Sequence, residues 1–168
     1  MSEDTPEQPT ETEETEKTGT FLVTAADEES AVLKDVTSGQ VHTLAANPGV
    51  ERDEAIEGTV APEPPLNVSW RLVEIERQWR LSLDVSEESP TAHSREIAAD
   101  QSVGDLTRKE RAGTGELHVI SVPEDGTDEA VQDVLSDREG TLSRAARLGV
   151  ARVEIRSEPG VVVVRYMP

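Results

Sequence analysis

The chain has 168 residues, of which 35 are acidic and 16 basic, and a formal net charge of −19. Cysteine is absent, which excludes disulfide bonds, cysteine-ligated zinc and a thiol nucleophile. No apolar run approaches the roughly 20 residues that span a bilayer, and the polar, acidic N-terminus does not have the basic start and apolar core of a signal peptide. We therefore expect a cytoplasmic protein of one or two small domains that does not associate with membranes.

The basic residues comprise 13 arginines but only 3 lysines. Acid excess with few lysines is typical of proteins that work in molar salt. At about 1 M ionic strength the Debye length falls to roughly 3 Å, so dense like charge no longer strongly destabilises the fold. The carboxylates also favour solubility. The composition predicts a cytosolic protein of a halophile, and the alternative is an ordinary acidic protein with an acidic tail.

The negative charge is unevenly distributed along the chain. Residues 1–17 carry a net charge of −6, residues 18–88 carry −9, and residues 89–168 carry −4. The first segment has no apolar residue after Met1, so it cannot bury enough surface to offset its ordering entropy, and we predict a disordered acidic tail. The last segment is the least repulsive to a polyanion.

Short runs with apolar residues at alternate positions follow the tail. They cover residues 20–25, 31–36, 40–44, 56–60, 66–75 and 79–85. Turn sequences such as Thr37-Ser38-Gly39 and Asn47-Pro48-Gly49 separate them. Six short strands in so few residues indicate a small closed or nearly closed β-barrel, and we assign it to residues 18–88.

Residues 89–168 mix helical and strand patterns. Ser89 and Pro90 have the residue types of an N-cap and first helical position, and they predict a helix that ends near Gln101. A strand over 117–122, helices over 128–137 and 141–148, and strands over 150–156 and 161–166 follow. The fold class is therefore mostly β, or α+β, with an α-β-α-α-β-β module after the barrel and its helices on one face of a three-stranded sheet.

Two stretches carry a family resemblance. Residues 18–60 read TGTFLVTAADEESAVLKDVTSGQVHTLAANPGV followed by ERDEAIEGTV, and the chain ends in TLSRAARLGVARVEIRSEPGVVVVRYMP. With the acidic, lysine-poor composition, the chain after the tail resembles an uncharacterised protein family of halophilic archaea. The resemblance implies a haloarchaeal cytosolic origin and supplies no catalytic residue. A shorter phrase, residues 48–60, is similar to turn-strand phrases of oligonucleotide-binding barrels.

Catalytic and cofactor motifs are missing from the sequence. His42, His93 and His118 lack the i, i+4 spacing of a helical metal pair, and we expect ordinary surface or edge residues, with packing favoured for His42. Neither a Gly-x-Ser-x-Gly elbow nor a phosphate loop occurs. Gly113-Thr114-Gly115 precedes a strand, whereas a dinucleotide loop follows one, so we predict a turn there. The sequence predicts no metal, no cofactor and no enzyme activity.

The remaining candidate site is basic, because arginine suits bidentate phosphate contacts. Its residues are Arg108, Lys109, Arg111, Arg144, Arg147, Arg152, Arg156 and Arg165. These side chains could assemble a polyanion site, or they could pair with acids such as Glu110, Glu139, Glu154 and Glu158. Stacking aromatics, which single-stranded nucleic acids favour, are few.

The function predicted from the sequence is therefore binding rather than catalysis. We expect an interaction protein with a protein partner, because high salt strengthens apolar contacts and screens charge. The alternative is an RNA- or DNA-associated module that uses the C-terminal arginine cluster.

Overall fold

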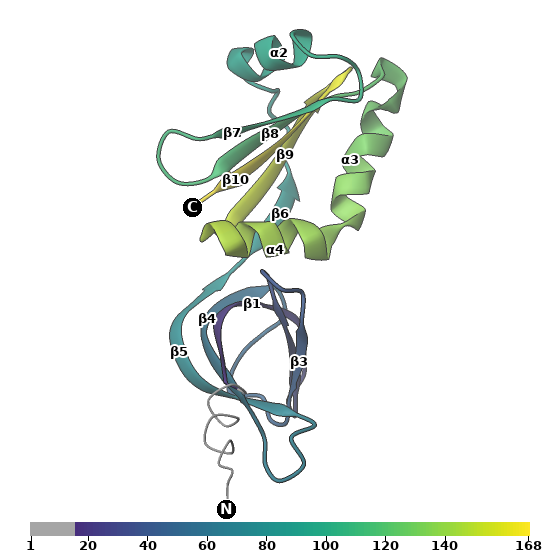
Figure 1. Cartoon of the computed structure of the whole chain (residues 1–168). Helices are drawn as coiled ribbons and strands as arrows, with labels where there is room; N and C mark the ends of the chain where they lie inside the picture. The colour runs from purple at the N-terminus through teal and green to yellow at the C-terminus, as the bar shows by residue number, and fades with distance from the viewer. Residues whose placement is uncertain (1–15) are drawn as a thin grey trace, which may run out of the picture. The chain divides into compact units, whose positions relative to one another are not determined.

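The computed structural model describes residues 16–168, which form two compact units divided between Trp79 and Arg80. Residues 1–15 of the predicted disordered tail lie outside the described residues, whereas Lys17 opens the first strand. The two units are coloured by residue number in Figure 1. Each is taken by itself below.

The first unit is a closed five-stranded barrel (Figure 1). Its strands are β1 (Lys17–Ala26), β2 (Ala31–Asp35), β3 (Val41–Leu44), β4 (Glu54–Pro62) and β5 (Trp70–Arg80). They follow the order β1-β2-β3-β5-β4, and β1 closes the barrel on β4. The β3–β5 pair is parallel, with Leu44 opposite Trp70. The predicted β-barrel is thus confirmed.

Alternate side chains of the strands fill the barrel. Phe21, Leu33, Leu44, Ile56 and Val60 are fully or almost fully buried and belong to one apolar cluster. Because side chains alternate across a strand, the intervening residues face outward, as Val41 and Thr43 do on β3. Apolar alternation thus coincides with the core face on β1 and β4, whereas on β3 the polar His42 is buried and the apolar Val41 is exposed.

Two parts of the predicted barrel differ in the structure. Leu66 and Val68 were expected on the core face of a strand, but they lie in the turn before β5 and are 76% and 79% exposed. The run 79–85 was expected as a barrel strand, yet β6 (Ser82–Val85) pairs in parallel with β9 of the second sheet. The segment predicted as the barrel, residues 18–88, therefore included β6, which is a strand of the second sheet.

The second unit has a five-stranded sheet in the order β6-β9-β10-β8-β7. The strands after β6 are β7 (Leu106–Glu110), β8 (Glu116–Ser121), β9 (Arg152–Glu158) and β10 (Val161–Met167). A two-residue Pro159-Gly160 turn joins β9 and β10, and Gly160 has the positive φ of 90° that a type II turn requires. The predicted three-stranded sheet omitted β6 and β7, because β7 has the charged sequence LTRKE.

Helices cover both faces of this sheet, and not one face as expected. They are α2 (Ala92–Ala99), α3 (Thr127–Ser136) and α4 (Arg138–Leu148), with a 3-10 turn over Glu124–Gly126 (Figure 1). Ala98 of α2 packs on Val119 and Val163. The residues that alternate with these, such as Val162 and Val164, are buried on the opposite face, where α3 and α4 pack. Gly149 ends α4 with φ of 76°, directly after the helix predicted over 141–148.

The start of α2 lies two residues later than the sequence indicated. Thr91, and not Ser89, is the N-cap, and its Oγ1 accepts a hydrogen bond from the backbone N–H of Ser94 at 3.2 Å. Pro90 therefore precedes the cap. Both Ser and Thr favour this position, so composition alone did not distinguish them.

Close strand contact at Gly58 gives a test of the barrel. A Cβ added to Gly58 would lie 2.1 Å from the carbonyl oxygen of Glu74, whereas one added to Gly19, directly opposite on β1, would meet Asp35 Oδ2 at 3.7 Å. We expect Gly58→Ala to lower the free energy of unfolding by about 2 kcal/mol or more, because backbone must move. Gly19→Ala should change it by less than about 1 kcal/mol.

Urea denaturation followed by tryptophan fluorescence measures this difference, since both tryptophans, Trp70 and Trp79, lie on β5 of the barrel. Equal unfolding midpoints for the two alanine variants would contradict the close packing of β4 against β5.

Candidate functional site

One cleft of the second unit lies on the α2 face of the sheet. Its volume is about 330 Å³, and its wall is formed by the start of α2, the end of β7 and the middle of β8, β9 and β10. The basic residues that line it are Lys109, Arg111, Arg156 and Arg165. Half of the sequence-predicted candidates therefore meet in one cavity.

Strand register explains why these residues meet. Lys109 on β7 is paired with Leu117 on β8, Leu117 with Arg165 on β10, and Arg165 with Glu154 on β9. Paired residues project from the same face of a sheet, so this row places two cations and a carboxylate around one leucine. In the next row, Arg156 is paired with Val163, which also lines the cleft.

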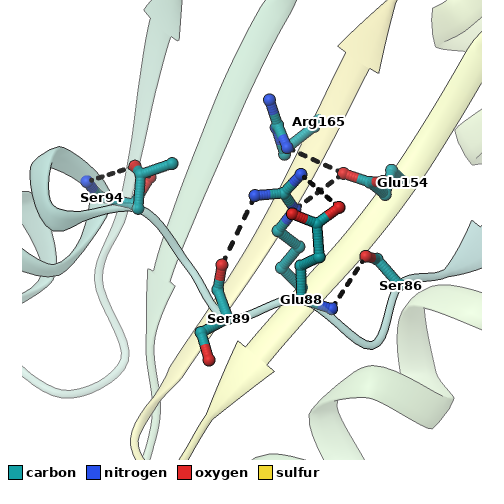
Figure 2. Close-up of polar contacts among 8 residues, drawn as sticks. Ser86, Glu88, Ser89, Ser94, Glu154 and Arg165 are labelled. Carbon is teal, nitrogen blue, oxygen red and sulfur yellow. Dashed lines mark hydrogen bonds and ion pairs between the residues drawn. The ribbon is translucent and has the colours of Figure 1, made fainter.

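Glu154 holds two of the guanidinium groups together. Its Oε1 accepts a hydrogen bond from Arg156 Nε at 2.9 Å and another from Arg165 Nη1 at 2.8 Å (Figure 2). The side chains of Arg156, Arg165 and Glu154 are 14%, 20% and 23% exposed. One carboxylate thus neutralises half of the charge of two half-buried arginines, and the shared contact fixes their orientation.

Further contacts hold Arg156 on its other side. Its Nη2 lies 3.5 Å from Oε2 of Glu88, a carboxylate that is 73% exposed, and its Nη1 lies 3.5 Å from the carbonyl oxygen of Ser89. Figure 2 shows Glu88 on the segment that leads from Ser86 to Ser89, beside Glu154. Because Glu88 is so exposed, its long ion pair adds little stability.

The other two cations lie at the β7–β8 hairpin. Arg111 donates from Nη1 to the carbonyl oxygen of Thr114 at 2.8 Å, which ties its side chain to the predicted Gly113-Thr114-Gly115 turn. Lys109 is exposed, and among residues 16–168 no hydrogen bond or ion pair occupies its ammonium group. Against the four cations, Glu110 lines the cleft, and Glu154 and Glu88 lie beside it. The local balance is positive in a protein of net charge −19.

The remaining four candidates lie outside the cleft. Arg108 alternates with Lys109 on β7 and is paired with His118, so it belongs to the opposite face. Arg144 of α4 donates to Glu116 Oε1 from Nε at 2.9 Å and from Nη2 at 2.7 Å. Arg152 donates to the carbonyl oxygen of Pro168 at 3.1 Å, and Arg147 lies on α4. Arg108 and Arg144 are thus separated from the cleft by the sheet, whereas Arg152 lies on the α2 face but outside the cleft.

On that opposite face, Glu116 also forms a hydrogen bond with Nε2 of His118 at 2.8 Å, and the ring of His118 lies 4.9 Å from that of Tyr166. Burial lowers the pKa of His118, and the bond to Glu116 opposes that change. Burial raises the pKa of the Tyr166 hydroxyl, because it disfavours the charged form of that group as it does for His118. The expectation that His118 is a surface or edge residue is wrong, because α4 covers this face.

Three residues of the cleft had not been singled out from the sequence as site residues. Thr91, His93 and Ser94 contribute the first turn of α2 to its wall. Their sequence carries no charge pattern, and their role depends on where α2 packs. Among residues 16–168, no group of three or more histidine and carboxylate side chains is placed to hold a metal ion.

His42 confirms the packing that was favoured for it. It is fully buried in the barrel, with its ring centroid 4.4 Å from that of Trp70 and 5.6 Å from that of Phe21. Neither ring nitrogen has a hydrogen-bond partner. Burial lowers the pKa of His42, and Asp35 and Lys17 act on it in opposite directions. The imidazole is therefore held in its neutral form.

A pH dependence of barrel stability follows. In the unfolded chain His42 binds a proton near its ordinary pKa of about 6.5, whereas burial in the folded barrel lowers the pKa of this residue. The free energy of unfolding is therefore highest above that pH and decreases below it, where the unfolded state binds the extra proton. We expect the tryptophan-monitored free energy of unfolding to drop between pH 7 and pH 5. His42→Phe should flatten this part of the profile, and an unchanged slope in that variant would contradict the assignment.

The chain is similar to a known protein family. A family model matches residues 17–157, which is most of the sequence. The chain belongs to DUF5812, a family of unknown function. No curated protein and no solved structure matched it. The match spans both units and ends within β9, so the cleft of this DUF5812 protein lies largely inside the shared region, with Arg165 beyond it.

Proposed function

We propose that this DUF5812 protein is a non-enzymatic cytosolic binding protein whose C-terminal unit binds single-stranded RNA through the basic cleft. The convergence of Lys109, Arg111, Arg156 and Arg165 on one cavity supports the proposal, because it reverses the sign of charge locally in an acidic protein. Arginine forks match phosphate oxygens, and the half-buried Leu117 can receive a sugar or base beside them.

The composition and the barrel support two finer parts of this proposal. The acidic, lysine-poor sequence fits a haloarchaeal cytosol. The closed order β1-β2-β3-β5-β4 of five strands fits a barrel of the oligonucleotide-binding kind. Since residues 18–88 carry a net charge of −9, phosphate contacts are assigned to the C-terminal unit and not to the barrel surface. Among residues 16–168, no helix is both long and apolar enough to cross a bilayer.

A matched pair of charge reversals on β7 tests the RNA site. Lys109 faces the cleft and Arg108 faces away, so Lys109→Glu and Arg108→Glu change the net charge equally. In about 1 M KCl, where the Debye length is about 3 Å, only charges in direct contact with the RNA should contribute to the binding affinity. We expect Lys109→Glu to weaken binding of a labelled single-stranded RNA of about ten nucleotides at least fivefold, and Arg108→Glu to leave it unchanged.

Fluorescence anisotropy of the full chain measures these affinities, and circular dichroism checks that both variants fold. Equal losses in the two variants would remove the cleft from the proposal. No binding of any RNA by the unaltered protein would overturn the RNA function itself.

The proposed halophilic origin has a separate test. Repulsion among the surface carboxylates that give the net charge of −19 should be relieved as salt screens it. We expect the melting temperature, followed by circular dichroism, to rise between about 0.2 M and about 3 M KCl as the Debye length shrinks. A melting temperature that does not change with salt would contradict this origin.

A protein partner is the second candidate, and the turn before β5 favours it. Leu66 and Val68 are among the most exposed apolar side chains of the described residues, in a segment that also contains a cis Pro64-Pro65 peptide bond. Adjacent exposed apolar residues are typical of contact sites. A partner retained from a halophile lysate by the unaltered chain, but not by a Leu66→Ser, Val68→Ser variant, would support this role. Equal retention by both would contradict it.

A further inference from the structure

We propose that the cleft selects a terminal phosphate, the 5′-phosphomonoester end of an RNA strand, and that Glu154 enforces the selection by occupying the two arginines in the absence of ligand. The inference rests on the proposed RNA function and specifies which part of the strand enters the cleft. Its basis is the shared contact of Arg156 and Arg165 with one carboxylate oxygen.

An incoming anion must compete with Glu154 for these guanidinium groups. A carboxylate carries one negative charge, as does an internal phosphodiester. A phosphomonoester carries about −1.5 to −2 near neutral pH and presents three strong acceptor oxygens. Only the monoester therefore offers the arginine pair more charge than Glu154 already supplies, and an internal linkage gains little by approaching it.

The cleft contains further donors for such a group. Lys109, without a protein partner among the described residues, supplies an ammonium group from β7. At the first turn of α2, the Thr91 hydroxyl donates to Ser94 Oγ at 3.0 Å, which leaves the Ser94 hydroxyl as the donor for a ligand in the cleft. Backbone N–H groups of a first helical turn add positive potential to these side chains. These donors surround a compact, highly charged phosphomonoester more completely than they surround an internal phosphodiester of a strand that passes through the cleft.

The size of the cleft fits one end of a strand. Its volume of about 330 Å³ is at the lower limit of small-ligand sites, which start near 300 Å³. Leu117 and Val163 form an apolar strip between the cations, and His93 lies at the rim on α2. One phosphate with its sugar and base would occupy this space, while the rest of the strand extends outside.

The first experiment compares two RNA strands of identical sequence, one with a 5′-phosphate and one with a 5′-hydroxyl, by anisotropy with the full chain in about 1 M KCl. We expect the phosphorylated strand to bind about tenfold more tightly at pH 7.5. This preference should shrink as the pH falls through about 6, where the monoester dianion takes up a proton and becomes a monoanion. Equal affinities would overturn the selection and leave RNA binding intact, whereas no binding of either strand would overturn both.

The second experiment tests Glu154 with a matched control. Glu154→Gln frees the arginine pair, so the hydroxyl-ended strand should gain about tenfold in affinity and the preference for the phosphate should fall. Glu158→Gln removes the same charge from the same strand and breaks the 2.9 Å pair with Arg95, outside the cleft. It should keep the full preference. An unchanged preference in a folded Glu154→Gln variant would overturn the role of Glu154, and the pH profile of the unaltered protein tests the phosphate selection independently of both variants.

Discussion

The antiparallel register of β7, β8, β9 and β10 decides which side chains of the C-terminal unit can meet. Because paired residues project from one face, the row Lys109–Leu117–Arg165–Glu154 forms a surface from residues that are far apart in the sequence. A shift of one residue in any pair would move a cation to the face covered by α3 and α4. The cleft, its charge and its apolar strip all follow from that register.

Burial of charge explains how the cleft is stabilised in an acidic protein. Two arginines with side chains mostly removed from water would repel each other without a shared anion, and Glu154 supplies it from the adjacent strand. On the opposite face Glu116 Oε1 likewise contacts two side chains, the guanidinium of Arg144 and the imidazole of His118, whose pKa is lowered by burial. Each face thus centres on one carboxylate, with the exposed Lys109 near the first and the exposed Arg108 near the second, and the α2 face has the cleft where Lys109, Arg111, Arg156 and Arg165 converge.

Several features were predictable because they depend on local chemistry. Alternate apolar residues over 20–25 predicted the barrel strand that contains Phe21 and Val23, and the patterns over 141–148 and 150–166 predicted a helix followed by two strands, with Gly149 and Gly160 at the two junctions. The predictions failed where pairing with a distant segment decides whether a strand forms and which sheet it joins. Leu83 alternates as well as any barrel residue, yet β6 pairs with β9, and alternation does not say which sheet a strand joins. The charged β7 has little apolar pattern of its own and is a strand because it pairs with β8.

Composition and short-range periodicity were sufficient to establish the acidic character, the absence of cysteine chemistry, the barrel and the identity of the basic residues. Tertiary structure alone decided that four of those eight residues share a cleft, that Arg108 and Arg144 lie on the other face, and that Thr91, His93 and Ser94 of α2 complete the wall. The physical reason is strand pairing. Register and helix packing join residues separated by dozens of positions, and no pattern within a single segment encodes that distance.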